Sequence, residues 1–273
     1  MIHYRNENIT VFQSHLQQTT STVLQTPDLV LVVDPCWLPG EVEEIRQHVE
    51  AIRAGRPLYL LFTHADWDHI IGYRAFPDAT VIASQAVHTY PDVDRQRKLD
   101  AIRNFDGNYY LDRPYPIEFP SVDLVIEHDG QLLTFGDTTL TFYHAHGHTR
   151  DGLFTIVEPL GVFLAGDYLS DAEFPFIYYS STEYDTTMQK VEQILQTHNI
   201  SLLVPGHGSA TQHTDEIRRR TKESLAYIAQ VRDCVQHDKQ AELSAMIDPW
   251  KYAPQLRRFH QDNIDRITRE LQA

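Results

Sequence analysis

The sequence predicts an α/β (α+β) protein: a four-layer αββα sandwich of two mixed β-sheets with helices on the outer faces. Short apolar runs typical of strands come in two series, and each series is interrupted or followed by stretches with helical periodicity. No linker, low-complexity tract or shift in composition divides the 273 residues. We therefore expect residues 1–273 to form a single domain.

The first series begins as a β-meander. Strands are predicted at residues 9–12, 22–24, 29–33, 58–62 and 80–83. Between the third and the fourth of these, Pro39-Gly40 opens a helix that ends near Gly55 and has its apolar residues on one face. Residues 58–62 are apolar throughout, which is typical of a strand buried on both faces.

Residues 85–121 interrupt this order and are predicted to be an insertion. A polar helix at about residues 93–104 leads into an aromatic, proline-rich stretch at residues 109–120 that has neither helix nor strand periodicity. We expect this stretch to cover the mouth of a site.

The second series repeats the pattern of strands followed by helices. Strands are predicted at residues 124–126, 132–135, 140–143, 153–157, 162–165 and 202–204. A helix at about residues 185–198 precedes the last strand. C-terminal helices at about residues 215–271, divided into 215–237 and 254–271, complete the chain.

The charge of the chain limits its partners. Asp and Glu (38) outnumber Lys and Arg (23), which gives a net charge of −15. Long nucleic acids and anionic membrane surfaces repel such a protein, so both are disfavoured and we expect a small-molecule substrate. A local basic pocket that uses Arg95, Arg97 and Lys98 is still compatible with this charge.

Cysteine content and apolar patterning indicate the compartment. Cys36 and Cys234 are too few for a disulfide framework and fit a reducing environment. The first residues show no secretory pattern, and the longest apolar runs are too short to span a bilayer. We expect a cytoplasmic protein with no membrane segment.

Histidines and aspartates gather at the ends of predicted strands. Directly after the strand at residues 58–62 the sequence reads Thr-His-Ala-Asp-Trp-Asp-His, which places His64, Asp66, Asp68 and His69 within six positions. In an extended segment residues 64, 66 and 68 point to the same side, and His69 can join them as a helix starts. Four ligand-type side chains so close together predict a metal site.

Three further candidates stand beside glycine, each just after a strand. They are His148 in Gly-His-Thr, Asp167 in Gly-Asp and His207 in Pro-Gly-His-Gly. Glycine permits the tight turns and close backbone approach that ligand loops require. Each motif alone is weak, but their order and their strand context strengthen the set.

This set resembles the metallo-β-lactamase-fold superfamily, and the likeness runs from about residue 9 to residue 231. The family's leading motif is H-x-H-x-D-H, followed by a G-H-T histidine, an A-G-D aspartate and a P-G-H-G histidine. The resemblance assigns His64 and His148 to a first metal. It assigns Asp68, His69 and His207 to a second metal, with Asp167 as the bridge.

Asp66 departs from this pattern, because the family has histidine there. The shorter side chain could fail to reach the first metal; if it does bind, the extra carboxylate favours iron or manganese. We therefore expect two divalent ions, with zinc as the first choice and iron or manganese as alternatives. A carboxylate here resembles the glutamate of diiron flavoproteins, whose flavodoxin-like domain does not fit in this chain, and the aspartate of some membrane-channel nuclease domains.

The resemblance implies a metallo-hydrolase. A metal-bound hydroxide, formed near neutral pH, would attack a small ester, lactone or thioester, with Asp68 as the catalytic residue that orients the nucleophile or accepts its proton. The alternatives are a metal-dependent phosphodiesterase or nuclease, an iron-dependent oxidoreductase, and a binding protein that has lost the first metal. A homodimer is compatible with the resemblance, since many relatives are dimers.

Other residues near the motifs have two interpretations. Asp34 either orients a ligand histidine or belongs to an ordinary turn, and Tyr168 with residues 174–179 either lines a pocket or packs the edge of the sandwich. His144 and His146 are interpreted as non-ligands. The helical histidines are expected to be solvated: His48, His198, His213, His237 and His260.

Overall fold

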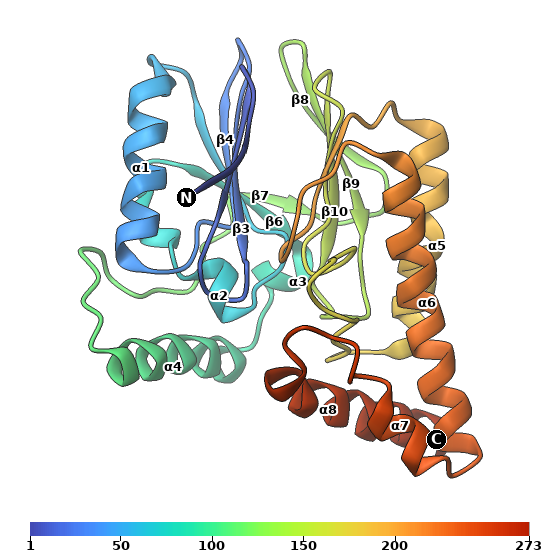
Figure 1. Cartoon of the computed structure of the whole chain (residues 1–273). Coiled ribbons are helices and arrows are strands. Elements are labelled where there is room, and N and C mark those ends of the chain that lie inside the picture. The colour runs from blue at the N-terminus through green and yellow to red at the C-terminus, as the bar shows by residue number, and fades with distance from the viewer. Residues whose placement is uncertain (273) are drawn as a thin grey trace.

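The computed structural model describes residues 1–272 and confirms the four-layer αββα sandwich (Figure 1). The first sheet has seven strands in the order of the chain: β1 (Ile2–Arg5), β2 (Ile9–Gln13), β3 (Thr20–Gln25), β4 (Val30–Val33), β5 (Leu58–Leu61), β6 (Thr80–Ser84) and β7 (Leu124–Ile126). Strands β1 to β4 form an antiparallel meander, whereas β4 to β7 are parallel. Parallel neighbours need crossover connections, which the helices between them supply.

The second sheet has five strands in the order β12-β11-β10-β9-β8. Their bounds are β8 (Gln131–Phe135), β9 (Thr138–His144), β10 (Leu153–Glu158), β11 (Val162–Leu164) and β12 (Leu202–Val204). Only β11 and β12 are parallel; the other pairs are antiparallel. Strands β9, β11 and β12 consequently run in the same direction and end at the same edge.

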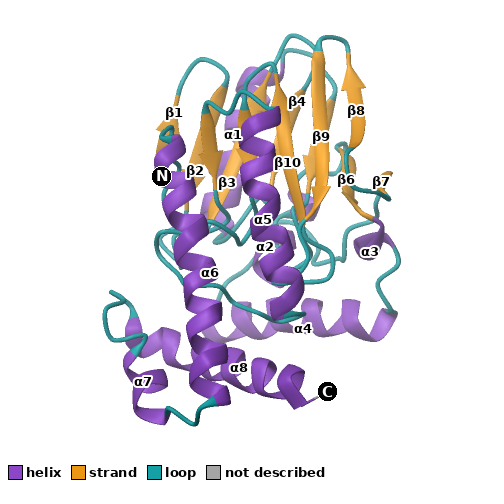
Figure 2. Cartoon of the chain, turned by 90° about the vertical axis from the view of Figure 1, so that its right-hand side faces the viewer, coloured by secondary structure: helices purple, strands orange, loops and turns teal. Residues whose placement is uncertain are grey.

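Helices cover the outer face of each sheet (Figure 2). They are α1 (Pro39–Arg53), α2 (Trp67–Ile70), the 3₁₀ turn η1 (Tyr73–Ala75), α3 (Gln85–His88), α4 (Asp92–Tyr109), α5 (Ser181–Thr197), α6 (Thr214–Gln236), α7 (Gln240–Ala245) and α8 (Ala253–Gln272). Helix α1 lies outside the first sheet, and α5 and α6 lie outside the second. Helices α4, α7 and α8 lie below the sandwich in both views.

Three apolar cores hold these layers together. Between the sheets, Leu31 and Leu61 of the first sheet share a core with Phe142 and Leu164 of the second. A second core packs α1 on the first sheet, and a third packs α5, α6 and α8 on the second. Almost every residue of β4 and β5 is buried, as expected for strands covered on both faces.

Residues 85–121 differ from the prediction. They form two helices and a loop, and the aromatic Tyr115 packs on the core beside α1 while Tyr109 and Tyr110 face solvent. The prediction that the aromatic stretch covers the mouth of the site is wrong. The part that reaches the site is helix α4, through Lys98.

Two other local predictions change. Strand β1 lacks the apolar character by which strands were predicted, since none of its residues is buried. His260 of α8 is buried and bonds to Tyr227 and to the carbonyl of Leu243, so the expectation that it is solvated is wrong. Within residues 1–272, no helix has both the length and the apolar character to cross a membrane.

Candidate metal centre

Strand directions bring the predicted site residues to one edge of the sandwich. Asp34 and His64 follow the parallel strands β4 and β5, whose carboxyl ends meet at the same edge of the first sheet. His148, Asp167 and His207 follow β9, β11 and β12, which end together in the second sheet. The two edges face one another, and the amide of Leu153 donates to the carbonyl of Thr63 across the gap.

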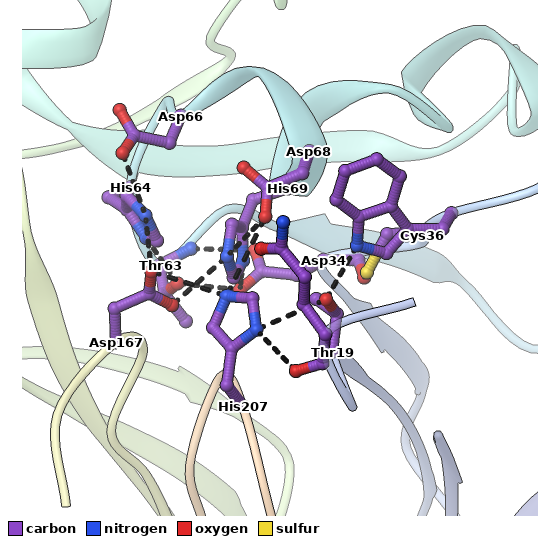
Figure 3. Close-up of polar contacts among 12 residues, drawn as sticks. Thr19, Asp34, Cys36, Thr63, His64, Asp66, Asp68, His69, Asp167 and His207 are labelled. Atoms are coloured by element: carbon purple, nitrogen blue, oxygen red, sulfur yellow. Dashed lines mark hydrogen bonds and ion pairs between the residues drawn. The ribbon is translucent and has the colours of Figure 1, made fainter. Parts of the chain in front are cut away.

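The segment that begins at His64 converges by a different route from the one predicted. Instead of extending, the chain turns at Asp66, which is the N-cap of the short helix α2. Asp68 and His69 then lie in the first turn of this helix, where they point to the same side as His64 (Figure 3). Negative side chains are favoured in the first turn of a helix.

Asp167 lies close to all four imidazoles of the cluster, and Figure 3 shows its carboxylate beside His64, His69 and His207. Its Oδ1 is 3.0 Å from Nε2 of His69. Its Oδ2 is 3.2 Å from Nε2 of His148, 3.4 Å from Nε2 of His207 and 3.7 Å from Nε2 of His64. A carboxylate in this position can bridge two cations.

Asp68 joins two of these imidazoles in a cluster that we call the second half-site: Asp68, His69 and His207. Its Oδ2 lies 3.6 Å from Nε2 of both histidines. All three ligand atoms lie within 4.8 Å of one another, close enough to hold one metal ion. Burial raises the pKa of Asp68.

Asp66 lies beside the other two imidazoles, and we call His64, Asp66 and His148 the first half-site. Asp66 Oδ2 is 3.4 Å from Nε2 of His148 and 3.8 Å from Nε2 of His64. Its other oxygen accepts a hydrogen bond of 2.7 Å from Lys98 on α4. Burial alone would raise the pKa of Asp66, but the Lys98 ammonium and then His148 outweigh it and hold the pKa well below its ordinary value.

The donor atoms of the cluster fit divalent metal ions. Nε2 of His64, His69 and His148 and Oδ1 of Asp167 are buried and have no hydrogen-bond partner. Buried polar atoms are nearly always satisfied, so four such atoms facing one another point to a ligand. Imidazole nitrogen and carboxylate oxygen together suit zinc, iron and manganese.

Hydrogen bonds at Nδ1 aim the imidazoles of the second half-site. His69 Nδ1 lies 3.0 Å from Oδ2 of Asp34, and His207 Nδ1 lies 3.0 Å from the carbonyl of Gln17 and 3.2 Å from Oγ1 of Thr19. Such partners fix the ring and its tautomer, leaving Nε2 for a metal. Asp34 therefore orients a histidine, which is the first of its two interpretations.

The first half-site has partners of the same kind. His64 Nδ1 lies 3.1 Å from Oγ1 of Thr63, and His148 Nδ1 lies 2.8 Å from the carbonyl of Phe176. The hydroxyl of Tyr168 accepts from the amide of His148 and donates to the carbonyl of Ala145. These bonds fix the loop that carries His148.

Burial and charge set the protonation of the centre. Burial, reinforced by His69, holds the pKa of His64 well below its ordinary value. Burial acts the same way on His69, but the carboxylates of Asp167 and Asp68 outweigh it, so that the pKa of His69 rises. Although burial favours the neutral acid, the imidazoles of His207 and His69 keep the pKa of Asp167 well below its usual range. The central carboxyl is therefore ionised, as a cation ligand must be.

A cleft of about 220 Å³ lies between the loop of Gln17 and helix α8. Gln17, which holds His207, lines it together with Tyr252, Leu256 and Phe259. Glu173 lines both this cleft and the smaller cavity formed by Asp167 and His207. Burial raises the pKa of Glu173 to about 7.

The remaining predicted residues divide between site and core. His146 pairs with Glu183 at 3.1 Å, away from the cluster. Phe176 stacks on Phe259 of α8 with the ring centroids 4.3 Å apart, whereas Tyr178, 38% exposed, lies 5.0 Å from the ring of His148. The aromatic run 174–179 thus packs the edge of the sandwich at one end and borders the site at the other.

Contacts that two segments of the chain make with the site were not predicted. Gln17 and Thr19 belong to a polar loop with no distinguishing pattern, and they lie 190 and 188 residues before His207 in the chain. Lys98 was expected only as part of a basic pocket, and nothing in its helix indicates that it faces Asp66. These contacts exist only in the folded chain.

The fold and this cluster define a metal-binding protein of the αββα sandwich class. The model of the metallo-beta-lactamase superfamily matches residues 16–222, and the chain belongs to this superfamily. Members bind divalent metal ions and are typically metallo-hydrolases.

Characterised relatives are distant. The chain is 22% identical to the human acyl-coenzyme A thioesterase MBLAC2 over 161 residues, which are 56% of this chain and 57% of the thioesterase, so it spans little more than half the length of that relative. It is 25% identical to the metallo-beta-lactamase type 2 of Bacillus sp. (strain 170) over 200 residues, 72% of this chain and 69% of that enzyme.

Solved structures share the fold. A metallo-beta-lactamase family protein from Thermus thermophilus superposes with a TM-score of 0.67 at 18% identity, covering 98% of this chain and 95% of the other. A metallo-beta-lactamase from Pontibacter korlensis gives 0.56 at 14% identity, with coverage of 83% and 97%. At this identity the likeness shows the fold alone.

Proposed function

We propose that this chain is a dinuclear metal-dependent hydrolase of a small ester, lactone or thioester. The observation that carries the proposal is the position of Asp167, whose carboxylate oxygens lie 3.0–3.7 Å from the Nε2 atoms of four histidines. In this proposal His64, Asp66 and His148 hold the first ion, and Asp68, His69 and His207 hold the second. Asp167, which lies close to histidines of both half-sites, would be shared by the two ions.

Bound divalent ions would polarise the substrate carbonyl and lower the pKa of a water molecule to about 7. Asp68 acts on that water. Its Oδ2 faces His69 and His207, so its other oxygen is the atom that would accept a proton from the attacking water. Burial, which raises the pKa of Asp68, makes the carboxylate a better proton acceptor.

The cleft supports a small substrate with an apolar part. Leu256 and Phe259 offer apolar surface, and Gln17, Gln18 and Gln255 offer polar atoms beside it. Its volume of about 220 Å³ suits a small acyl or leaving group. The thioesterase among the relatives supports a thioester as one member of the substrate class.

A substrate panel tests the proposal. The protein is reconstituted with zinc or manganese, its metal content is measured by mass spectrometry, and hydrolysis of a lactone, a thioester, a nitrophenyl ester, a β-lactam and a bis-phosphodiester is followed. We expect two ions per chain, activity on at least one ester-type substrate, and loss of that activity in His207→Ala and Asp68→Ala but not in His146→Ala.

Two results would contradict it. Activity on the bis-phosphodiester alone would assign the chain to the phosphodiesterases. Purification with iron, together with oxygen uptake and no hydrolysis, would assign it to the iron-dependent oxidoreductases.

A further inference from the structure

An open pocket of about 430 Å³ lies beside the first half-site and is lined by Tyr90, Asp94, Arg97, Lys98 and Arg150. Lys98 joins it to the metal centre, because its side chain lines the pocket and its ammonium donates to Asp66. His148 precedes Arg150 by two positions on the same loop. The pocket is therefore adjacent to the first half-site.

Arg150 brings a free positive charge to this pocket. Among residues 1–272, its guanidinium has no hydrogen bond and no carboxylate within ion-pair distance, while Arg97 is paired with Asp94 at 3.0 Å. Its carbon Cζ lies 4.6 Å from the ring centre of Tyr90. Stacking on an aromatic face holds a guanidinium in place and leaves its N–H groups for a ligand.

Two of the carboxylates around the pocket are paired with cations of its own lining. Asp66 is bound by Lys98, and Asp94 by Arg97. Asp151 is buried; one of its oxygens accepts from the amide of Ala65, and the other has no hydrogen-bond partner among the described residues. Of the cations that line the pocket, Arg150 is the one without a carboxylate partner among the described residues. An unpaired cation is notable in a chain with a net charge of −15.

We propose that this pocket binds an anionic group of the substrate, a carboxylate or a phosphate, through Arg150. The proposal deepens the proposed function and rests on it for the substrate, since the scissile carbonyl must sit at the metal centre between this pocket and the α8 cleft. A guanidinium fork matches either oxyanion with two parallel hydrogen bonds. Lys98 adds positive charge from the side of Asp66.

A pair of esters tests this specificity. The zinc-reconstituted enzyme is assayed with p-nitrophenyl butyrate, which is neutral, and with mono-p-nitrophenyl succinate, which carries a carboxylate. We expect Arg150→Gln to lower the preference for the succinate ester, measured as the ratio of kcat/KM values, by about 10- to 100-fold, the range of a hydrogen bond to a charged group. Arg103→Gln, with the same charge change on α4, is the matched control and should keep the ratio.

Calorimetry separates this proposal from the proposed function. Succinate and inorganic phosphate are each titrated into the zinc-loaded wild type, Arg150→Gln, Arg150→Lys and Arg103→Gln. Binding that weakens about tenfold or more in Arg150→Gln and less in Arg150→Lys supports the pocket, and the tighter of the two anions identifies the group. The anion-binding result supports the pocket even if neither ester is hydrolysed, because the absence of hydrolysis would contradict only the proposed ester substrate.

Equal binding in wild type and Arg150→Gln would place the anion on the metal ions and overturn the proposal, as would the absence of binding in the wild type. A retained fold in Arg150→Gln is checked by circular dichroism. Should that variant unfold, Arg150→Lys decides between the two outcomes, because it keeps the charge and loses the fork.

Discussion

The two half-sites of the metal centre hold their carboxylates differently. In the second half-site Asp68 lies within ion-pair distance of two imidazoles, and those imidazoles are aimed by Asp34, Gln17 and Thr19. In the first, Asp66 is shared with the ammonium of Lys98 at 2.7 Å. A cation at the first half-site must therefore compete with a lysine for its carboxylate, and we propose that the first half-site binds metal more weakly.

The largest expected effect comes from removing an imidazole. In His207→Ala the second half-site loses a ligand, and we expect its metal affinity to fall by more than about 100-fold, the upper end for outer-shell residues. In His148→Ala only the weaker ion should be lost. Metal content after dialysis measures both. His146→Ala, whose ring pairs with Glu183, is the control and should keep both ions.

Removal of an orienting carboxylate should have the next largest effect. Asp34→Asn replaces the acceptor of the His69 Nδ1 bond, and we expect the affinity of the second half-site to fall about 10- to 100-fold. Competition with a zinc chelator measures it. The surface variant Asp129→Asn is the control. An unchanged affinity would mean that Asp34 acts only on Thr63, which it also binds.

Removal of the competing ammonium should act in the opposite direction. Like charges 4 Å apart repel by about 1 kcal/mol even in bulk water and by more near a protein, so Lys98→Met should tighten the first half-site about tenfold. Lys190→Met, whose ammonium pairs with Asp129 far from Asp66, should change nothing. Weaker binding in Lys98→Met would show that Lys98 chiefly positions Asp66.

The last prediction concerns the stability of the loop of His148 rather than metal affinity. Tyr168→Phe leaves the amide of His148 and the carbonyl of Ala145 without their shared partner, which should lower the free energy of unfolding by about 1–3 kcal/mol. Urea denaturation measures the change. Tyr143→Phe, at a more exposed hydroxyl, should cost less. Equal losses in the two variants would show that burial of the hydroxyl does not matter here.

The sequence predicted the sandwich and the residues that gather at its edge, because both depend on local patterns. Apolar runs such as residues 58–62 mark strands whatever they pack against, and the ligand candidates follow those strands directly. It did not predict that Lys98 binds Asp66 or that Gln17 holds His207, since these contacts join segments that only tertiary folding brings together. His260 was misplaced for the same reason: its burial depends on how α8 packs against Tyr227.

The local backbone conformation of the segment from His64 to His69 was not predicted from the sequence either. The candidate ligands from His64 to His69 lie together as expected, but the prediction kept residues 64–68 extended and let the helix start at His69. The structure uses the first turn of α2, with Asp66 as its N-cap. An extended segment and the first turn of a helix can both bring nearby side chains to one side. The sequence pattern alone therefore does not distinguish the two conformations.

The asymmetry between the half-sites is tested most directly by titrating zinc into the metal-stripped protein by calorimetry, for the wild type and Lys98→Met. We predict two binding steps in the wild type, of which Lys98→Met tightens the weaker one about tenfold and leaves the tighter one unchanged. If the two steps shift together, or if the wild type shows a single step, the claim that Lys98 weakens metal binding at the first half-site alone would be contradicted.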